Sequence, residues 1–217
     1  MGASAWEGAL KLAAVIPAAG AGARLGGVAK ALLRSGGETL LARIVRTARE
    51  VGLDDAVVVV GAPFGDAVAD HARSLAARVV VNPDPSRGMA SSIELGFAAL
   101  GGEDAAWLWP VDHPNIAPAT LRALIAALVA HPKGICSSGG SLAHRATVAQ
   151  PRFGERGGHP PLIARALWPR LAACSASTGG ARGVFAELAP GSIVAVPVDD
   201  PGVIRDVDTP ADAEALS

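Results

Sequence analysis

The rest of this chain is organised around the sequence LAAVIPAAGAGARLGGVAKALL, residues 12–33. Its first five residues, Leu12–Ile16, are small and apolar and predict a strand, which ends at Pro17 because proline donates no sheet hydrogen bond. The next five residues carry almost no side chain. Backbone N–H groups in such a loop can approach a phosphate closely and present partial positive charge to it. We therefore predict a phosphate-binding loop formed by Ala18, Ala19, Gly20, Ala21 and Gly22.

Two cationic side chains, Arg24 and Lys30, follow this loop within a few residues. Arginine offers a planar fork that matches phosphate oxygens, whereas lysine offers a compact point charge. The chain contains only three lysines against sixteen arginines, so a lysine at this place is more suggestive than a lysine elsewhere. We expect both side chains to bind phosphate.

Other interpretations of this stretch compete with a phosphate-binding loop. The dinucleotide pattern G-x-G-x-x-G fails because its third glycine position, counted from Gly20, is Leu25. The next strand ends at Val60-Gly61, without a carboxylate for a ribose. The P-loop pattern is absent as well. A structural strand–turn–helix corner and a targeting segment stay open, although the apolar run is short and interrupted by a proline.

The chain as a whole predicts one globular domain. Its 217 residues are enough for a substantial core, and no apolar run approaches the ~18 residues that a membrane span needs. A net charge of −1 without a basic block gives no reason to expect nucleic acid or an anionic membrane as a partner. We expect a disordered leader over residues 1–10 and a single domain over residues 11–217.

The two cysteines, Cys136 and Cys174, lie far apart and outside any C-x-x-C motif or His/Cys cluster. We interpret them as buried free thiols. Free thiols suit a reducing compartment, and we therefore expect a cytoplasmic protein.

Strand patterns and helix patterns alternate along the first half of the chain. This rhythm predicts a three-layer α/β/α sandwich, with helices on both faces of a mostly parallel, Rossmann-like sheet joined by right-handed crossovers. The expected strands are Ala56–Val60, Arg78–Val81 and Ala105–Val111, and the expected helices are a segment beginning near Leu40, then Asp66–Leu75, Gly88–Leu100 and Ala119–Ala130.

The second half is less regular. We expect strands over Gly134–Ser137, Thr147–Gln150 and Ser192–Val196, a turn-rich segment over Gly154–Pro161, a helix over Leu162–Leu171 broken by Pro169, a helix over Ala181–Leu188, and a last helix over Pro210–Leu216. Thr209 is the expected N-cap of that last helix, with Pro210 at its first position.

Three carboxylates are candidate metal ligands. Asp112 follows a buried strand directly, and the carboxyl ends of parallel strands are where ligands bind in such sheets. Mg²⁺ prefers one or two carboxylates together with phosphate oxygens and water. Asp206 and Asp208 would point to one face if their segment were a strand, and either could supply a second ligand. Asp112 as a turn or helix-cap residue stays open as an alternative.

Polar residues at the start of the third helix are candidate base contacts. Asn82, Gly88 and Ser92 lie between a strand end and that helix, where hydroxyls and free N–H groups can bind a base edge or an anion. Ordinary helix capping is the alternative. His159 stands in a turn-rich loop, and a lone histidine in such a place is more often structural.

Four segments together resemble a known family. Residues 12–30 resemble the L-A-A-G-x-G-x-R-x-G-x-x-K signature of MobA-like nucleotidyltransferases, and NPDPSRGMASSIELG, GGHPPLI and DDPGVIRDVDTPADAEAL resemble later segments of the molybdenum cofactor cytidylyltransferase branch. The resemblance runs from Leu12 to the C-terminus. Two departures are Val111 in place of the family's glycine before Asp112, and Pro161 in place of an apolar residue.

The resemblance implies a fold of the nucleotide-diphospho-sugar transferase type and a Mg²⁺-dependent transfer of a nucleoside monophosphate. An acceptor phosphate attacks the α-phosphate of an NTP, and pyrophosphate leaves. The catalytic residues implied are Arg24, Lys30 and Asp112. The amides of Gly20–Gly22 and Arg24 would hold the β- and γ-phosphates, and Lys30 would meet the charge at the α-phosphate. Mg²⁺ would be held by Asp112 and by Asp206 or Asp208, the base would lie near Asn82, Gly88 and Ser92, and His159 would face the acceptor.

The form Pro17-Ala18-Ala19-Gly20 favours CTP, because L-A-A-G accompanies CTP and L-A-G-G accompanies GTP in this family. The favoured acceptor is molybdopterin carrying molybdenum, with a molybdoenzyme as a possible recipient of the product. A sugar phosphate, methylerythritol phosphate, or a non-catalytic maturation chaperone that binds the cofactor are the alternatives.

Overall fold

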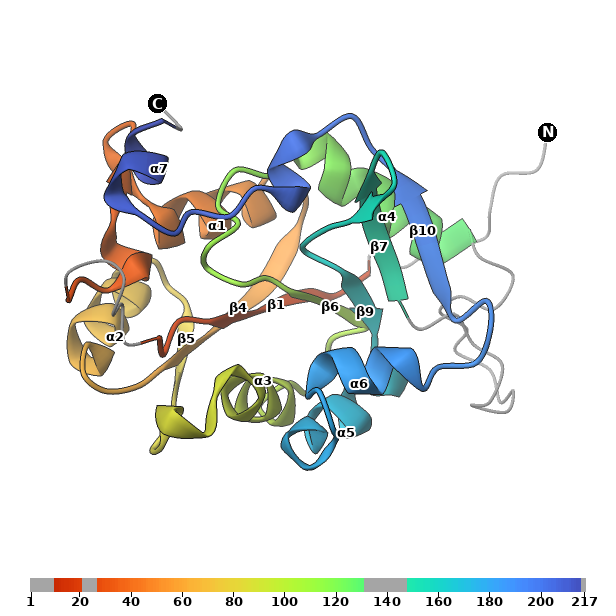
Figure 1. Cartoon of the computed structure of the whole chain (residues 1–217), viewed down its shortest axis with the longest axis horizontal. Coiled ribbons are helices and arrows are strands. Elements are labelled where there is room, and N and C mark those ends of the chain that lie inside the picture. The colour runs from red at the N-terminus through yellow and green to blue at the C-terminus, as the bar shows by residue number, and fades with distance from the viewer. Residues whose placement is uncertain (1–9, 21–26, 131–147, 216–217) are drawn as a thin grey trace.

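The computed structural model describes residues 10–20, 27–130 and 148–215 (Figure 1). Among these residues, no helix is both long enough and apolar enough to cross a bilayer. The expected leader, the cysteine Cys136 and the strand expected over Gly134–Ser137 lie outside the described residues.

One mostly parallel sheet forms the centre of the described chain, as the sequence predicts. Its strands lie in the order β10-β7-β9-β6-β1-β4-β5, and β8 pairs with β7. Strand β1 is parallel to both of its neighbours, β4 and β6, whereas β9 is antiparallel to β6 and β7. The bounds are β1 Leu12–Pro17, β4 Leu53–Val60, β5 Arg78–Val81, β6 Ala105–Leu108, β7 Val148–Phe153, β8 Arg156–Gly157, β9 Leu162–Ala164 and β10 Ile193–Pro197; a separate small hairpin pairs β2 Arg34–Ser35 with β3 Glu38–Thr39.

Strand β1 is buried on both faces, which explains why it is apolar at every position. Leu12, Ala14 and Ile16 belong to the core on one face of the sheet, and Ala13 and Val15 to the core on the other. This alternation is the period of two that a strand imposes on its side chains.

Helices cover both faces of the sheet, so the three-layer sandwich is confirmed (Figure 1). Helices α1, α2 and α4 pack on the first face, and α3, α5 and α6 on the second. Their bounds are α1 Leu40–Arg49, α2 Gly65–Ser74, α3 Met89–Ala98, α4 Pro118–Ala130, α5 Trp168–Leu171 and α6 Ala181–Ala186. The last helix, α7 Pro210–Glu214, begins with the expected cap: the Thr209 hydroxyl accepts from the amide of Asp212, and the Asp212 carboxylate accepts from the amide of Thr209.

The prediction of a helix over Leu162–Leu171 is wrong. Leu162–Ala164 forms β9, a fully buried strand that fills the space between β6 and β7. A 3-10 turn, η5 Arg165–Leu167, follows, and α5 begins at Trp168. Pro169 lies in the first turn of α5, where a missing N–H is tolerated, so it starts that helix rather than breaking one. Sheet pairing overrides the helical pattern of the segment.

Two other boundaries differ. The strand expected over Ala105–Val111 ends at Leu108, although the amide of Trp109 still donates to the carbonyl of Val15 at 2.9 Å. The segment around Asp206 and Asp208 is not a strand. A 3-10 helix, η7 Pro201–Ile204, precedes it, and the chain then runs without regular structure to α7.

Candidate active site

The ends of three parallel strands meet at Gly61, directly after β4. The amide of Ala18 donates to the carbonyl of Val59 at 2.8 Å, which ties the loop after β1 to β4. A Cβ on Gly61 would lie 3.1 Å from Ala19 Cβ, 3.1 Å from the carbonyl oxygen of Asn82 and 2.5 Å from Pro85. The bare backbone at Gly61 therefore lets the expected phosphate loop and the expected base segment lie against each other.

The described part of the phosphate loop comprises Ala18, Ala19 and Gly20. The other expected members, Ala21, Gly22 and Arg24, lie outside the described residues, so their roles stay predictions.

Lys30 brings three distant segments together. It opens a 3-10 helix, η2 Lys30–Leu32, rather than lying in a loop. Its ammonium lies 2.9 Å from Asp208 Oδ1 and 3.7 Å from Asp112 Oδ2. The lysine side chain is only 21% exposed, so water screens these contacts less than it screens an ion pair on the open surface. The structure thus places the expected α-phosphate lysine and an expected metal ligand at one point.

Asp112 and Asp208 are positioned by backbone contacts. The amide of Val207 donates to the carbonyl of Asp112 at 2.8 Å, and the side chain of Val207 is buried against Leu40. The amide of Asp208 donates to the carboxylate of Asp212 at 3.0 Å. Asp206, by contrast, is exposed, so of the two aspartates left open by the sequence it is Asp208 that faces Asp112 across Lys30.

This carboxylate pair suits a hard divalent cation. Asp112 Oδ1 is buried and has no hydrogen-bond partner among the described residues, while its Oδ2 and Asp208 Oδ1 face the same ammonium. Within the described residues no group of three or more His, Cys, Asp or Glu side chains is arranged to hold a metal. A two-carboxylate set matches Mg²⁺, which completes its shell with water and phosphate oxygens.

The side-chain amide of Asn82 is used within the protein. Its NH₂ donates to the hydroxyls of Ser91 and Ser92, each at 2.9 Å, and its carbonyl accepts from the amide of Asp84 at 3.0 Å. Asn82 is only 2% exposed. These bonds join the end of β5 to the start of α3. Gly88 caps that helix with φ +87°, a conformation that L side chains rarely adopt.

His159 has a neighbour that the sequence analysis missed, His113. The two imidazole rings stack at a centroid distance of 4.7 Å and an angle of 30°. His113 also approaches the carboxylate, with its Nε2 3.9 Å from Asp112 Oδ1. The signal available in the sequence was its place in Val111-Asp112-His113-Pro114, directly after the candidate metal ligand.

Burial holds His159 in its neutral form at neutral pH. Burial, together with the charges of His113 and Arg182, lowers the pKa of His159 to about 4, and the nearby carboxylate of Asp112 opposes this only in part. A neutral imidazole can donate one hydrogen bond and accept another, but it adds no positive charge to the acceptor side of the site.

The structure explains the residue types of the segment Asp200-Pro201-Gly202. The buried carboxylate of Asp200 accepts from the amide of Ala117 at 2.9 Å and from the hydroxyl of Thr120 at 2.7 Å. A Cβ on Gly202 would lie 1.8 Å from the carbonyl oxygen of Asn115, so glycine is required there. This segment ties η7 to the start of α4 and leads the chain toward Asp208.

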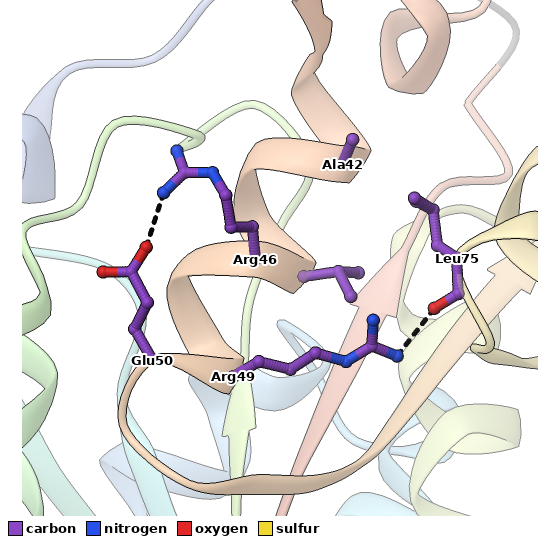
Figure 2. Close-up of a pocket in the computed structure, with 6 residues that line it drawn as sticks. Ala42, Arg46, Arg49, Glu50 and Leu75 are labelled. Carbon is purple, nitrogen blue, oxygen red and sulfur yellow. Dashed lines mark hydrogen bonds and ion pairs between the residues drawn. The ribbon is translucent and has the colours of Figure 1, made fainter.

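A hollow of about 390 Å³ on the outer side of α1 contains none of the candidate site residues (Figure 2). Its polar side chains are already paired: Arg46 with Glu50 at 2.6 Å, and Arg49 with the carbonyl of Leu75 at 2.6 Å. It is lined by Ala42, Val45, Arg46, Arg49, Glu50 and Leu75. We assign no function to it.

Comparison with known proteins shows what the chain as a whole is similar to. The pattern of the MobA-like NTP transferase domain matches residues 14–192. A relative from Paenarthrobacter nicotinovorans, named nicotine blue oxidoreductase, is 36% identical over 195 residues, which are 90% of this chain and 91% of that protein.

Solved structures share the fold. Rv0371c from Mycobacterium tuberculosis H37Rv is 27% identical, with a TM-score of 0.73 over 95% of this chain and 97% of that one. A second structure of Rv0371c, in complex with manganese, is 24% identical, with a TM-score of 0.63 over 88% of this chain and 89% of that one.

Proposed function

Because the chain belongs to the MobA-like NTP transferase domain family, we propose that it transfers CMP from CTP to the phosphate of molybdenum cofactor. The family membership is established; the transfer reaction, the nucleotide, the acceptor and the metal are the proposal. The observation that carries it is the convergence of Lys30 with Asp112 and Asp208 beside the bare loop after β1.

In the proposed reaction, an oxygen of the acceptor phosphate attacks the α-phosphorus of CTP. The bond from that phosphorus to the β-phosphate oxygen breaks, and pyrophosphate leaves. The amides of Gly20–Gly22 bind phosphate oxygens, and Arg24 assists them. Lys30 stabilises the charge that develops at the α-phosphate. Such electrostatic stabilisation contributes most of the rate acceleration in phosphoryl-type transfers. A divalent cation on Asp112 and Asp208, Mg²⁺ in our proposal, would neutralise further phosphate charge and help to align the reacting groups.

The proposed base site lies at the start of α3. Asn82 acts there by holding the hydroxyls of Ser91 and Ser92 and the turn before Gly88, rather than by reaching out to the base itself. Ser92 accepts from Asn82 and keeps its own proton to donate. The preference for CTP rests on the Ala18-Ala19-Gly20 form of the loop.

The proposed acceptor side is formed by His159 with His113. Since His159 is neutral, it would orient the acceptor through a hydrogen bond and leave charge neutralisation to Lys30 and the cation. A sugar phosphate or methylerythritol phosphate is compatible with the same site. We propose a cytoplasmic location, which suits the buried free thiol of Cys174, and a molybdoenzyme as the recipient of the product.

A panel of CTP, GTP, ATP and UTP against molybdenum cofactor, a sugar phosphate and methylerythritol phosphate tests this proposal, with pyrophosphate as the readout. We expect release with CTP, Mg²⁺ and molybdenum cofactor. Lys30→Ala should lower kcat/KM by about 100-fold or more. Lys11→Ala, which removes an exposed lysine, is the control. No pyrophosphate with any pair would refute the transferase and favour a chaperone.

A second candidate function follows from the relative that is named an oxidoreductase. That protein matches 90% of this chain at 36% identity, so the scaffold carries another activity in at least one named case. The G-x-G-x-x-G pattern and the ribose carboxylate are missing here, which disfavours a dinucleotide site. Mixing the protein with nicotine blue and NADH or NADPH and following both absorbances tests it. Turnover there, without pyrophosphate release in the panel, would establish the oxidoreductase instead.

A further inference from the structure

The Lys30 ammonium faces the two carboxylate oxygens that a cation held by Asp112 and Asp208 would bind. Its ammonium lies 2.9 Å from one oxygen and 3.7 Å from the other, whereas Mg²⁺ binds its oxygen ligands at about 2.0–2.1 Å. A cation bound between these oxygens would therefore overlap the ammonium or lie against it. Two positive groups cannot share that space.

The backbone that carries each carboxylate is held in place, and the long side chain of Lys30 is the group that can move. The backbone of Asp112 is tied to Val207, and the backbone of Asp208 to Asp212, at 2.8 and 3.0 Å. Lys30 stands at the first position of the three-residue 3-10 helix η2. Its four-carbon stem allows the ammonium to swing while the backbone stays in place.

We propose that Lys30 acts as the counter-ion of Asp112 and Asp208 until nucleotide binds, and so controls when a divalent cation can enter. Without nucleotide, the ammonium competes with the cation for both carboxylates, and the protein binds the cation weakly. Triphosphate in the loop after β1 offers Lys30 a stronger anionic partner, and its oxygens complete the cation's shell. The cation and the nucleotide then bind together. This last step rests on the proposed function, but the competition itself does not.

Mn²⁺ binding in the absence of nucleotide, followed by electron paramagnetic resonance of the free ion, tests the competition. Lys30→Met keeps an unbranched side chain, one atom shorter, and removes its charge. We expect Lys30→Met to bind Mn²⁺ at least 10-fold more tightly than the wild type, whereas Lys30→Arg, which keeps the charge, stays within about 3-fold of it.

The location of the ion is tested by adding Asp208→Asn to the Lys30→Met protein, which should remove the gain in affinity. Circular dichroism and Tm show that each variant is folded. Equal Mn²⁺ affinity of Lys30→Met and wild type would overturn the proposal, and so would a gain that survives Asp208→Asn. Because neither measurement uses nucleotide or acceptor, the result is independent of the pyrophosphate panel.

Coupling to nucleotide is tested with a non-hydrolysable CTP analogue on the wild type. We expect the analogue to raise Mn²⁺ affinity of the wild type several-fold more than that of Lys30→Met, after subtraction of Mn²⁺ bound by the analogue alone. An equal rise in both proteins would overturn the nucleotide-driven part of the proposal. It would leave the competition measured without nucleotide as it stands.

Discussion

The amide of Val207 donates a hydrogen bond to the carbonyl of Asp112 at 2.8 Å, and this bond joins the C-terminal segment to the loop after β6. The buried side chain of Val207 anchors the same point against Leu40. One residue later, Asp208 reaches Lys30, although 178 positions separate them in the sequence. The last part of the chain thus completes a site that begins at β1.

Exchange of Asp208 and Asp206 for asparagine provides a matched pair. Asp208 contacts Lys30, whereas Asp206 is exposed. We expect Asp208→Asn to lower kcat/KM for pyrophosphate release by about 100-fold, since it removes a charged ligand from the site. Asp206→Asn should stay within about 2-fold. Similar losses in both variants would show that the assignment of Asp208 is wrong.

Gly61→Ala should disturb the meeting point of β1, β4 and β5. The new Cβ would lie 2.5 Å from Pro85 and 3.1 Å from Ala19, so these neighbours must move. We expect a loss of about 1–3 kcal/mol in the free energy of unfolding and weaker CTP binding. Urea denaturation and nucleotide titration measure the two effects. Gly101→Ala, where a Cβ meets nothing within 4 Å, serves as the control; an equally mild result at Gly61 would contradict the close packing.

His71 makes the stability of the fold depend on pH. Burial, and to a smaller extent the charge of Arg34, lowers the pKa of His71 below its ordinary value of 6.5, and the ring contacts the hydroxyl of Thr39 at 2.7 Å. As the pH falls below 6.5, the unfolded chain takes up a proton that the folded protein does not, and stability is lost. At higher pH the His71 ring is neutral in both the folded and the unfolded state, so its titration costs the fold no stability.

The matched variant His71→Gln lacks this titration and can keep a hydrogen bond to Thr39. Between pH 7.5 and 5.5, the wild type should lose more unfolding free energy in urea than His71→Gln does. If the two proteins lost the same amount, the lowered pKa of His71 would be refuted.

Cys174 should be chemically inert in the folded protein. Its side chain is fully buried, and burial together with Glu94 raises the pKa of the thiol to about 11. At pH 8 only about one thiol in a thousand would be thiolate, which is the reactive form. In a Cys136→Ser protein, we expect no reaction with a disulfide reagent over an hour, and full reaction in urea. Prompt labelling without urea would show that Cys174 is accessible.

Much of the fold was predictable because local patterns and tertiary packing agree there. β1 is apolar at every position since both of its faces are covered, and the same is true of Val57–Val60 in β4. β9 was not predictable. Leu162–Ala164 has a short apolar pattern that fits a helix or a strand equally, and only pairing with β6 and β7 made it a strand.

The candidate site was predictable in its parts but not in its assembly. Asp112 was identified from its place after a strand, and Lys30 from its place after a bare loop. The sequence could not establish that the side chains of Asp112 and Lys30 lie next to each other in the folded protein. His113 was missed because nothing in its local sequence indicates that its ring stacks on a residue of another loop.

Local sequence was enough to predict the alternation of strands and helices, the burial of β1 and the bare loop that follows it, since each depends on neighbours within a few positions. Long-range packing is what brings Asp208 rather than Asp206 to face Asp112, with Lys30 between the two carboxylates. The physical reason is that such contacts depend on strand order and on a few long-range backbone bonds, and no local pattern records either.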